Sequence, residues 1–356
     1  MPTPRSLEEI SAEWLTRGLR RAGVTQAARV TGFRATRIGE GLGFLSSVFR
    51  LLLDYDRSEA DAPRSVVAKL EPADTSMRDF EGELHAFQRE IRFYEEIAPG
   101  APIRLARLYF AESEPPDYAM VMEDLSFARP GDQVAGLHAS QVKRGAYTIG
   151  CLQGRYWGDE ALRSFDWMPA SNGVQGDFDA KWDSFVEHFG YTVDPAGLEL
   201  GARLLGRADW LEAEIGRRPR TIVHSDLRAD NLMLGDEGTP EEILILDWQI
   251  AVRGLGAFDV ARLMGGSELP SERRGHQLEV LHAWWEALGA EGVRDYPFED
   301  ATRDLRLGAL ATLWYPVHFH TGVLESAGRS RALLERMFRR LFDSAVELDA
   351  GAVLPG

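Results

Sequence analysis

The chain has 356 residues, of which 44% are apolar and 27% are charged, and its formal net charge is −16. This length is enough for one large domain or two lobes, and the composition is that of a globular protein. Forty basic residues against 56 acidic ones are poorly suited to binding a phosphate backbone, so we expect no nucleic-acid partner. A cationic substrate would suit this charge, but solubility alone also explains it.

Cysteine content and apolar runs bear on the compartment. The single cysteine, Cys151, excludes an internal disulfide and a cysteine-based metal cluster. No uninterrupted apolar stretch is long enough to span a membrane, and no apolar run follows the first basic residue as in a secretory signal. We therefore expect a cytoplasmic protein with no membrane span. The oligomeric state cannot be read from the sequence.

The first third of the chain combines short strands with two amphipathic helices. Apolar residues at helical spacing predict helices over Ser6–Ala22 and Met77–Ile97. The glycine-rich segment Gly39–Gly43 suggests a hairpin between two of the strands. Segments rich in β-branched and aromatic residues predict the strands Ala28–Ile38, Ser47–Tyr55, Ser65–Leu70, Ala106–Ser113 and Tyr118–Met122.

From about Leu125 the sequence becomes mainly helical. The exception is Thr221–Leu246, where short β-like runs surround the richest motif in the chain. Further amphipathic helices are predicted over Leu278–Leu288, Thr302–Phe319 and Arg331–Leu348. This pattern predicts an α+β protein of two lobes, with a β-rich lobe at 1–124 and a helical lobe at 125–356.

The strongest chemical signal is the pattern H-x-D-x-x-x-x-N between two apolar runs, from His224 to Asn231. Sixteen residues later a second apolar run ends in Asp247, with a predicted turn between them. Transfer of a phosphoryl group to a hydroxyl needs a carboxylate that orients the hydroxyl and accepts its proton, and Asp226 is the candidate. Mg²⁺ takes oxygen ligands, which Asn231 and Asp247 would supply. We expect His224 to shape the loop.

These motifs resemble those of the kinase-like phosphotransferases, the group of the aminoglycoside phosphotransferases, choline kinase and ecdysteroid-kinase-like proteins. His-Ser-Asp-Leu-Arg-Ala-Asp-Asn is similar to their catalytic loop, and Leu-Asp-Trp-Gln to their metal-binding segment. Gly254–Ala261 resembles the family's G-x-x-x-x-D-[LV]-A, in which the Asp (here Asp259) braces the catalytic loop. The resemblance implies a protein-kinase-like fold that uses ATP and Mg²⁺ to phosphorylate a hydroxylated small molecule.

The resemblance also assigns nucleotide-binding residues in the first lobe. Ser65–Leu70 resembles the kinase V-A-I-K strand, so that Lys69 would reach the α- and β-phosphates and Ala68 would pack over adenine. Glu90 fits the family's E-[VI]-x-F-Y helix and would hold Lys69, with Glu83 and Glu95 as rivals.

Two further segments are assigned from their position. Ser46 and Ser47 follow the glycine-rich segment and are candidate phosphate contacts, although this segment is no Walker A motif and also reads as an ordinary hairpin turn. Backbone groups around Glu123 and Leu125 occupy the place of the interlobe hinge and would read the adenine edge.

Some assignments stay open. Arg228 would either neutralise charge on the transferring phosphoryl group or be a surface cation of the loop. Gln153 stands where many family members have His, which we expect to affect helix packing more than catalysis. The aromatic segment Trp314–His320, with Trp284 and Trp285, would either form core or line an acceptor site.

Two other functions compete with this assignment. No A-P-E segment follows Asp247, which argues against a protein kinase. An inactive pseudokinase with a regulatory or scaffolding role is the alternative, although the retained Lys69, Asp226, Asn231 and Asp247 argue against it. The acceptor could be an aminoglycoside or a choline-like, sterol-like or hydroxyacyl compound, and we favour an apolar hydroxylated one. The preference for ATP or GTP is undetermined.

Overall fold

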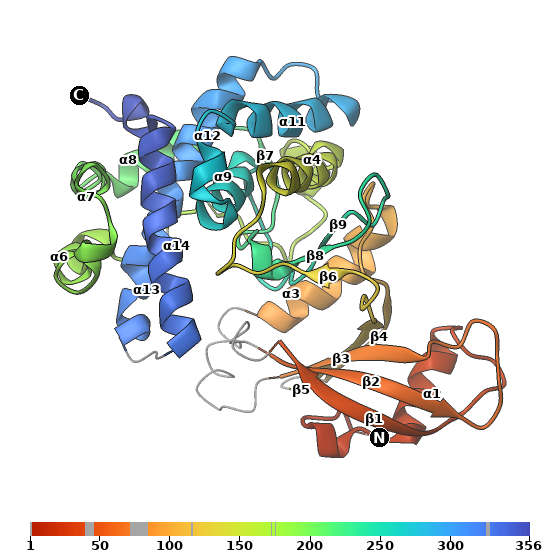
Figure 1. Cartoon of the computed structure of the whole chain (residues 1–356). Helices are drawn as coiled ribbons and strands as arrows, with labels where there is room; N and C mark the ends of the chain where they lie inside the picture. Colours follow the sequence, from red (N-terminus) through yellow and green to blue (C-terminus); the bar gives the residue numbers. More distant parts are fainter. Residues whose placement is uncertain are drawn as a thin grey trace. The chain divides into compact units, whose positions relative to one another are not determined.

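A computed structural model describes residues 2–39, 46–71, 85–114, 117–171, 173–174, 176–324 and 328–356. The chain divides into two compact units, each described by itself (Figure 1). The N-terminal unit comprises Met1–Ala128 and Leu246–Ile250, and the C-terminal unit comprises Arg129–Ile245 and Ala251–Gly356. Most of the predicted glycine-rich hairpin and residues 77–84 of the predicted helix Met77–Ile97 lie outside the described residues.

In the described part of the N-terminal unit, five strands form one antiparallel sheet in the order β1-β2-β3-β5-β4. Each of the five strands predicted for this region is present. Their bounds are β1 Val30–Ile38, β2 Ser47–Tyr55, β3 Ser65–Leu70, β4 Leu108–Glu114 and β5 Asp117–Glu123.

One face of this sheet is covered by α1 (Ala12–Arg21), which follows a 3-10 turn, η1 (Leu7–Glu9). The helix begins later than predicted, because the Ser11 hydroxyl caps it by accepting a hydrogen bond from the Trp14 amide at 3.1 Å. Its buried side chains pack against the residues of β3 that point the same way. This hydrophobic cluster includes Trp14, Leu15 and Leu19 of α1 and Val66, Ala68 and Leu70 of β3.

The opposite face of the sheet meets α3 (Ala86–Arg92), which continues into a π-helical turn, η2 (Phe93–Ile97), and a 3-10 turn, η3 (Ala98–Gly100). Phe87 of α3 stacks on Tyr118 of β5. The short segment Leu246–Ile250 packs here too, because Trp248 is fully buried and stacks on Phe93 with ring centroids 4.0 Å apart. This stacking holds the segment that carries Asp247 within the N-terminal unit.

The C-terminal unit contains two small antiparallel sheets, β6-β8-β9 and β10-β7. The strands are β6 Arg129–Pro130, β7 Arg220–Val223, β8 Leu232–Leu234, β9 Ile243–Ile245 and β10 Val252–Leu255. The pairing of β8 with β9, in which Leu232 lies opposite Ile245, confirms the predicted hairpin after the H-x-D-x-x-x-x-N motif.

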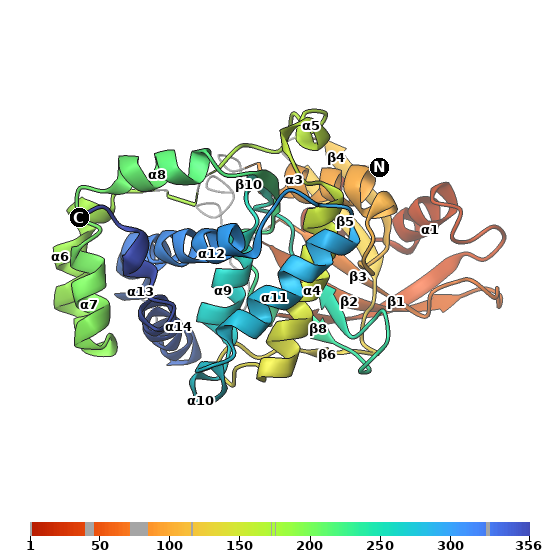
Figure 2. The same ribbon diagram turned by 90° about the horizontal axis from the view of Figure 1, so that it is seen from above.

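Helices make up the rest of this unit, and Figure 2 shows two closely packed pairs. α4 (Ala139–Arg155) lies along α11 (Gln277–Ala290), and a Cβ added at Gly150 of α4 would come within 2.8 Å of the Ala287 Cβ. α9 (Ala257–Ser267) packs against α12 (Phe298–Thr312) and also against α14 (Gly328–Glu347). The remaining elements are α5 Asp159–Leu162, α6 Phe178–Phe189, η4 Gly190–Thr192, α7 Pro195–Ala202, α8 Ala208–Gly216, η5 Ala229–Asn231, α10 Pro270–Arg273, α13 Trp314–Leu324 and η6 Ala350–Val353.

One predicted helix is divided in two. The segment Thr302–Phe319 was expected to be continuous, but α12 ends at Thr312 and α13 begins at Trp314. Pro316 explains the break, because its ring would clash with the carbonyl group four residues earlier. Within the described residues, no helix is both long and apolar enough to cross a membrane.

Candidate functional site

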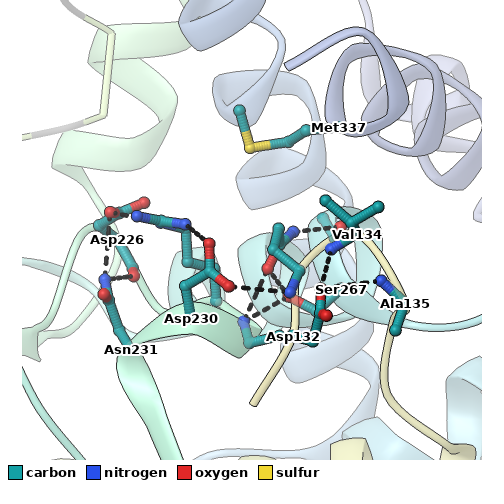
Figure 3. A network of polar contacts seen from close by, with 12 residues as sticks. Asp132, Val134, Ala135, Asp226, Asp230, Asn231, Ser267 and Met337 are labelled. Atoms are coloured by element: carbon teal, nitrogen blue, oxygen red, sulfur yellow. Dashed lines mark hydrogen bonds and ion pairs between the residues drawn. The ribbon is translucent and has the colours of Figure 1, made fainter. Parts of the chain in front are cut away.

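The loop between β7 and β8 presents Asp226 as the centre of a polar network (Figure 3). One carboxylate oxygen, Oδ1, accepts a hydrogen bond from Arg262 Nη2 at 2.8 Å. The other, Oδ2, accepts from Arg228 Nε at 2.9 Å and from Asn231 Nδ2 at 3.2 Å. Asn231 Nδ2 also donates to the Asp226 carbonyl at 2.9 Å. Asp226 and Asn231, which the sequence motif predicted to act together, are therefore in direct contact.

Electrostatics keep Asp226 ionised. Burial by itself would raise the pKa of this carboxyl, but the guanidinium groups of Arg228 and Arg262 lower the pKa to about 2. Its side chain is still 21% exposed, whereas that of Arg262 is 1% exposed. Asp226 is thus a charged, partly accessible carboxylate with a fixed orientation.

Arg228 lies between two carboxylates. Besides Asp226 it contacts Asp230, with Nη1 2.7 Å from Asp230 Oδ2. Burial opposes the charge of Arg228, but these two carboxylates raise its pKa. Of the two readings left open by the sequence, an exposed surface cation is excluded, because the residue is 9% exposed.

Asp259 braces the loop from the start of α9, as the resemblance implied. Its Oδ2 accepts from the His224 amide at 2.7 Å, and its Oδ1 accepts from the Ser225 amide at 2.9 Å. Complete burial raises the pKa of Asp259 to about 7. The loop also holds Ser225 at φ 73°, a left-handed conformation that is unfavourable for residues other than glycine. The His224 ring accepts from the Asp226 amide at 3.2 Å, which confirms the expected role of His224 in shaping the loop.

Gln153 joins this brace from α4. Its Nε2 donates to Asp259 Oδ2 at 3.0 Å, and its Oε1 accepts from Trp284 Nε1 at 2.6 Å. Gln153, at the position where the resemblance led us to expect histidine, therefore connects the loop support to α11. Trp284 is fully buried, so this tryptophan is core.

A second support of the loop was missed from the sequence. The Ala229 amide donates to Gln133 Oε1 at 2.8 Å and to Ser267 Oγ at 2.9 Å (Figure 3). The backbone amide of Gln133 in turn donates to Asp230 Oδ1 at 2.9 Å. Gln133 lies about a hundred residues before the loop and in no recognisable motif, so only the tertiary structure reveals this contact.

The N-terminal unit holds a second charged cluster. Lys69 Nζ donates to Glu90 Oε2 at 2.6 Å and to Asp247 Oδ1 at 2.9 Å. The side chains of Lys69 and Glu90 are 8% and 2% exposed, whereas that of Asp247 is 36% exposed. Of the rival partners of Lys69, Glu95 is exposed and Glu83 lies outside the described residues. Lys69, Glu90 and Asp247 are therefore brought together although they are far apart in sequence.

The backbone at Asp247 also departs from ordinary geometry, because its φ is 66°. This left-handed conformation is tolerated best by Gly, Asn and Asp. Burial alone would lower the pKa of Lys69, but the carboxylates of Asp247 and Glu90 more than offset it, and the pKa of this lysine is raised. An accessible carboxylate is thus held beside a buried ammonium group.

Strand register separates Ala68 from this cluster. Lys69 lies opposite Val48 of β2 and Met120 of β5, whereas its neighbour Ala68 points to the other face. There Ala68 is fully buried in the cluster under α1. The prediction that Ala68 packs over adenine is therefore not supported, since Val67 shares the face of Lys69.

A pair of substitutions tests this register. Ala68→Leu should destabilise the protein by about 1–3 kcal/mol through overpacking, with ATP affinity unchanged in the folded protein. Val67→Ala should instead weaken ATP binding by about fivefold, because about 1 kcal/mol of apolar contact is lost. Thermal unfolding and calorimetric titration with Mg-ATP measure the two effects. If Ala68→Leu weakened ATP binding and Val67→Ala did not, Ala68 would face the nucleotide.

The remaining predicted nucleotide contacts lie at the ends of strands. Ser46 and Ser47 are partly buried at the start of β2, and Ser47 lies opposite Leu70, on the α1 face. The Glu123 side chain pairs with Arg104 at 2.5 Å, so only its backbone could serve a ligand.

The chain after β5 is anchored by a carboxylate that the sequence did not single out. Asp124 accepts from Ser65 Oγ at 2.7 Å, from Arg50 Nε at 3.1 Å and from the Ser126 amide at 3.1 Å. These contacts tie the predicted hinge to β2 and β3. Leu125 is buried directly after this anchor.

The two predicted metal ligands have suitable donor atoms. Both hydrogen bonds of Asn231 to Asp226 use the amide nitrogen, which leaves the amide oxygen for a hard cation. The exposed fraction of Asp247 makes its carboxylate accessible. Among the described residues no cluster of three or more His, Cys, Asp or Glu could hold a metal. Mg²⁺ needs only one or two protein ligands when phosphate oxygens and water molecules supply the others.

Comparison with known families gives two partial matches. The model of the ecdysteroid kinase-like family matches residues 40–144, which include Lys69 and Glu90. A model described as "Uncharacterized oxidoreductase dhs-27" matches residues 202–305, which include Asp226 and Asn231. Residues 202–305 contain no G-x-G-x-x-G segment of the dinucleotide-binding type. A comparison with curated proteins finds no match.

Solved structures decide the fold. The GDP and kanamycin complex of APH(2")-IIIa is 13% identical over 91% of this chain and 94% of its own, with a TM-score of 0.52. The GDP complex of a mutant aminoglycoside 2'-phosphotransferase IIIa is 11% identical over the same shares, with a TM-score of 0.50. This chain resembles the kinase-like small-molecule phosphotransferases. The predicted kinase-like α+β fold, with a sheet-rich N-terminal part and a helical C-terminal part, is confirmed.

Proposed function

We propose that this protein is an ATP- and Mg²⁺-dependent phosphotransferase that moves the γ-phosphoryl group to a hydroxyl group of a small molecule. The observation that carries the proposal is the Asp226 network, in which an ionised, partly exposed carboxylate is held by Arg228, Arg262 and Asn231. The kinase-like fold and the GDP named in the two similar structures support a nucleotide as the phosphoryl donor.

Each group has one role in the proposal. Asp226 orients the acceptor hydroxyl and receives its proton. Arg228 neutralises part of the negative charge on the phosphoryl group that is transferred. Lys69, fixed by Glu90, binds the α- and β-phosphates. Mg²⁺, held by Asn231 and Asp247, would supply charge neutralisation at the phosphate oxygens. Catalysis then rests mainly on alignment and charge stabilisation.

Nucleotide recognition is assigned to the N-terminal unit. The base would contact Val67 and the backbone of Glu123 and Leu125. Ser46 stays a proposed phosphate contact, and Ser47 is proposed to contact phosphate through its backbone only, because its side chain lies on the α1 face. Side chains at the hinge are engaged elsewhere, as the pairing of Glu123 with Arg104 illustrates. Backbone groups can read a purine edge without them.

The acceptor is expected to have an apolar body. Close to Asp226, the Arg262 guanidinium lies 4.3 Å from the centre of the Tyr315 ring. One turn further along α13, the centre of the Phe319 ring lies 4.8 Å from that of Tyr315, and Phe319 is 43% exposed. No acidic residue occurs in α13. An exposed aromatic ring on a helix without acidic residues suits a neutral hydroxylated compound better than a polycation.

The pseudokinase alternative makes a different prediction, namely nucleotide binding or scaffolding without turnover. Two observations disfavour it. Asp226 and Lys69 both keep their charged partners, and the left-handed backbone at Asp247 and Ser225 is a strain that functional sites often retain.

The test is ADP release from Mg-ATP and Mg-GTP with a panel of acceptors. The panel contains sterol-like alcohols, hydroxyacyl compounds, choline-like alcohols and aminoglycosides, with Asp226→Asn assayed in parallel. Acceptor-dependent release that disappears in Asp226→Asn supports the proposal and names the acceptor class. Absence of both release and Mg²⁺-dependent nucleotide binding would overturn it in favour of the scaffolding role.

A further inference from the structure

Arg262 is a buried cation that no sequence motif singled out. It lies on α9, is 1% exposed, and its only carboxylate partner among the described residues is Asp226. Its other contacts in the described part of the chain include the sulfur atom of Met337, 3.3 Å from Nη1, and the side chain of Tyr315. A guanidinium in such surroundings is costly to bury, and an apolar residue would pack at less cost. Its presence therefore points to a requirement at Asp226.

Charge balance in the loop explains that requirement. Two buried or partly buried carboxylates, Asp226 and Asp230, contact Arg228. Asp230 also accepts from the Gln133 amide, so it serves the loop structure. If Arg228 were alone, it would be shared between two negative charges. With Arg262, two guanidinium groups face the two carboxylates of Asp226 and Asp230, which reduces repulsion of an anionic phosphate donor.

Geometry gives Arg262 a second effect. Asp226 Oδ2 has two donors, Arg228 and Asn231, whereas Oδ1 has Arg262 as its donor among the described residues. Removing Arg262 would let the carboxylate rotate about its Cβ–Cγ bond. Misplacement of a reacting group by about 1 Å can cost about 100-fold in rate.

We propose that Arg262 is a positioning residue that holds the Asp226 carboxylate in its working orientation and balances the charge of Asp230. This inference rests on the proposed phosphotransferase function. Burial prevents Arg262 from touching a substrate itself, so its effect is exerted through Asp226.

Steady-state kinetics of Arg262→Met tests the proposal. Methionine fits the contacts with Met337 and Tyr315 but carries no charge. We expect kcat to fall by about 100-fold, with the KM for Mg-ATP within about twofold of the wild type. Arg262→Lys restores the charge and should recover part of kcat. A folded Arg262→Met protein with wild-type kcat would overturn the proposal.

A double variant tests the charge balance separately. In Arg262→Met/Asp230→Asn, Arg228 keeps its ion pair with Asp226 and loses its ion pair with Asp230. Its kcat should therefore exceed that of Arg262→Met by at least about threefold, a coupling that independent sites do not show. A double variant no faster than Arg262→Met would refute the charge-balance part of the proposal.

Arg273→Met is the matched control. Arg273 is also fully buried and pairs with a carboxylate, Glu347, at 2.7 Å, but within the described part of the chain it makes no hydrogen bond or ion pair with the Asp226 loop. This control should lower the melting temperature and leave kcat unchanged. Equal losses of kcat in Arg262→Met and Arg273→Met would reduce Arg262 to a structural role.

Crystal structures of the variants test the role of Arg262 without relying on enzyme activity. In Arg262→Met, the Asp226 carboxylate should rotate or become disordered, whereas in Arg273→Met it should keep its place. An Asp226 that keeps its contacts with Arg228 and Asn231 in Arg262→Met overturns the inference, even if the enzyme is active. A wild type without phosphotransfer overturns the function, while the structures still decide the role of Arg262.

Discussion

Asp226→Asn is expected to lose phosphoryl transfer by about 100- to 10,000-fold while retaining Mg-ATP binding. Asparagine has the same shape and can still accept from Arg262 through its amide oxygen. It can neither receive the proton of the acceptor hydroxyl nor balance the two guanidinium groups. The measurements are initial rates of ADP release and calorimetric titration with Mg-ATP.

Stability needs a control in this experiment. Loss of the Asp226 charge leaves Arg262 buried without a carboxylate, and such an unpaired charge can destabilise a protein by several kcal/mol. Melting temperatures of Asp226→Asn and of Asp209→Asn, a change at an exposed position of α8, are therefore compared. If folded Asp226→Asn fails to bind nucleotide but transfers phosphate at high ATP concentration, Asp226 is a binding group and the proton acceptor lies elsewhere.

Asp247→Ala is expected to reduce turnover of Mg-ATP by at least about 100-fold. Even partners outside the ligand shell of a metal ion commonly cost about 10- to 100-fold in affinity or activity, and Asp247 is proposed as a direct ligand. The substitution also releases Lys69, whose second carboxylate partner is Asp247. Turnover as a function of Mg²⁺ concentration measures the effect.

Two companion variants make this result specific. Asp247→Asn keeps a residue that tolerates φ 66° but removes the negative charge, so it separates backbone strain from loss of the ligand. Asp236→Ala removes an exposed aspartate from the turn between β8 and β9 and should leave turnover unchanged. Near-normal activity of Asp247→Ala, with normal Mg²⁺ dependence, would remove Asp247 from the proposed metal site.

Local patterns were sufficient where a residue's role depends on its neighbours in sequence. The strand β3, the hairpin of β8 and β9, and the contact between Asp226 and Asn231 all arise within short segments. The partner of Lys69 was also identified, because Glu90 fits the E-[VI]-x-F-Y pattern that the resemblance implied.

Local patterns did not reveal which face of β3 holds Ala68 or where the helix after Phe298 ends. In β3 every residue from Val66 to Leu70 is apolar except Lys69, so the sequence does not reveal which face is covered by α1. The register of β3 with β2 and β5 assigns Ala68 to that core and Val67 to the face of Lys69. Similarly, the amphipathic pattern through Pro316 hid the break between α12 and α13.

By itself, the sequence predicted a strand-rich part followed by a helical part, because periodicity is a local property of the chain, and the resemblance of its spaced motifs implied the kinase-like fold and the candidate site residues. Only the tertiary structure decided which groups surround Asp226. Arg262, Gln133 and Ser267 come from segments distant in sequence, and each is an ordinary residue type in an ordinary helix or loop. Their importance arises from burial, since a charge or amide group removed from water must find its partner across the fold.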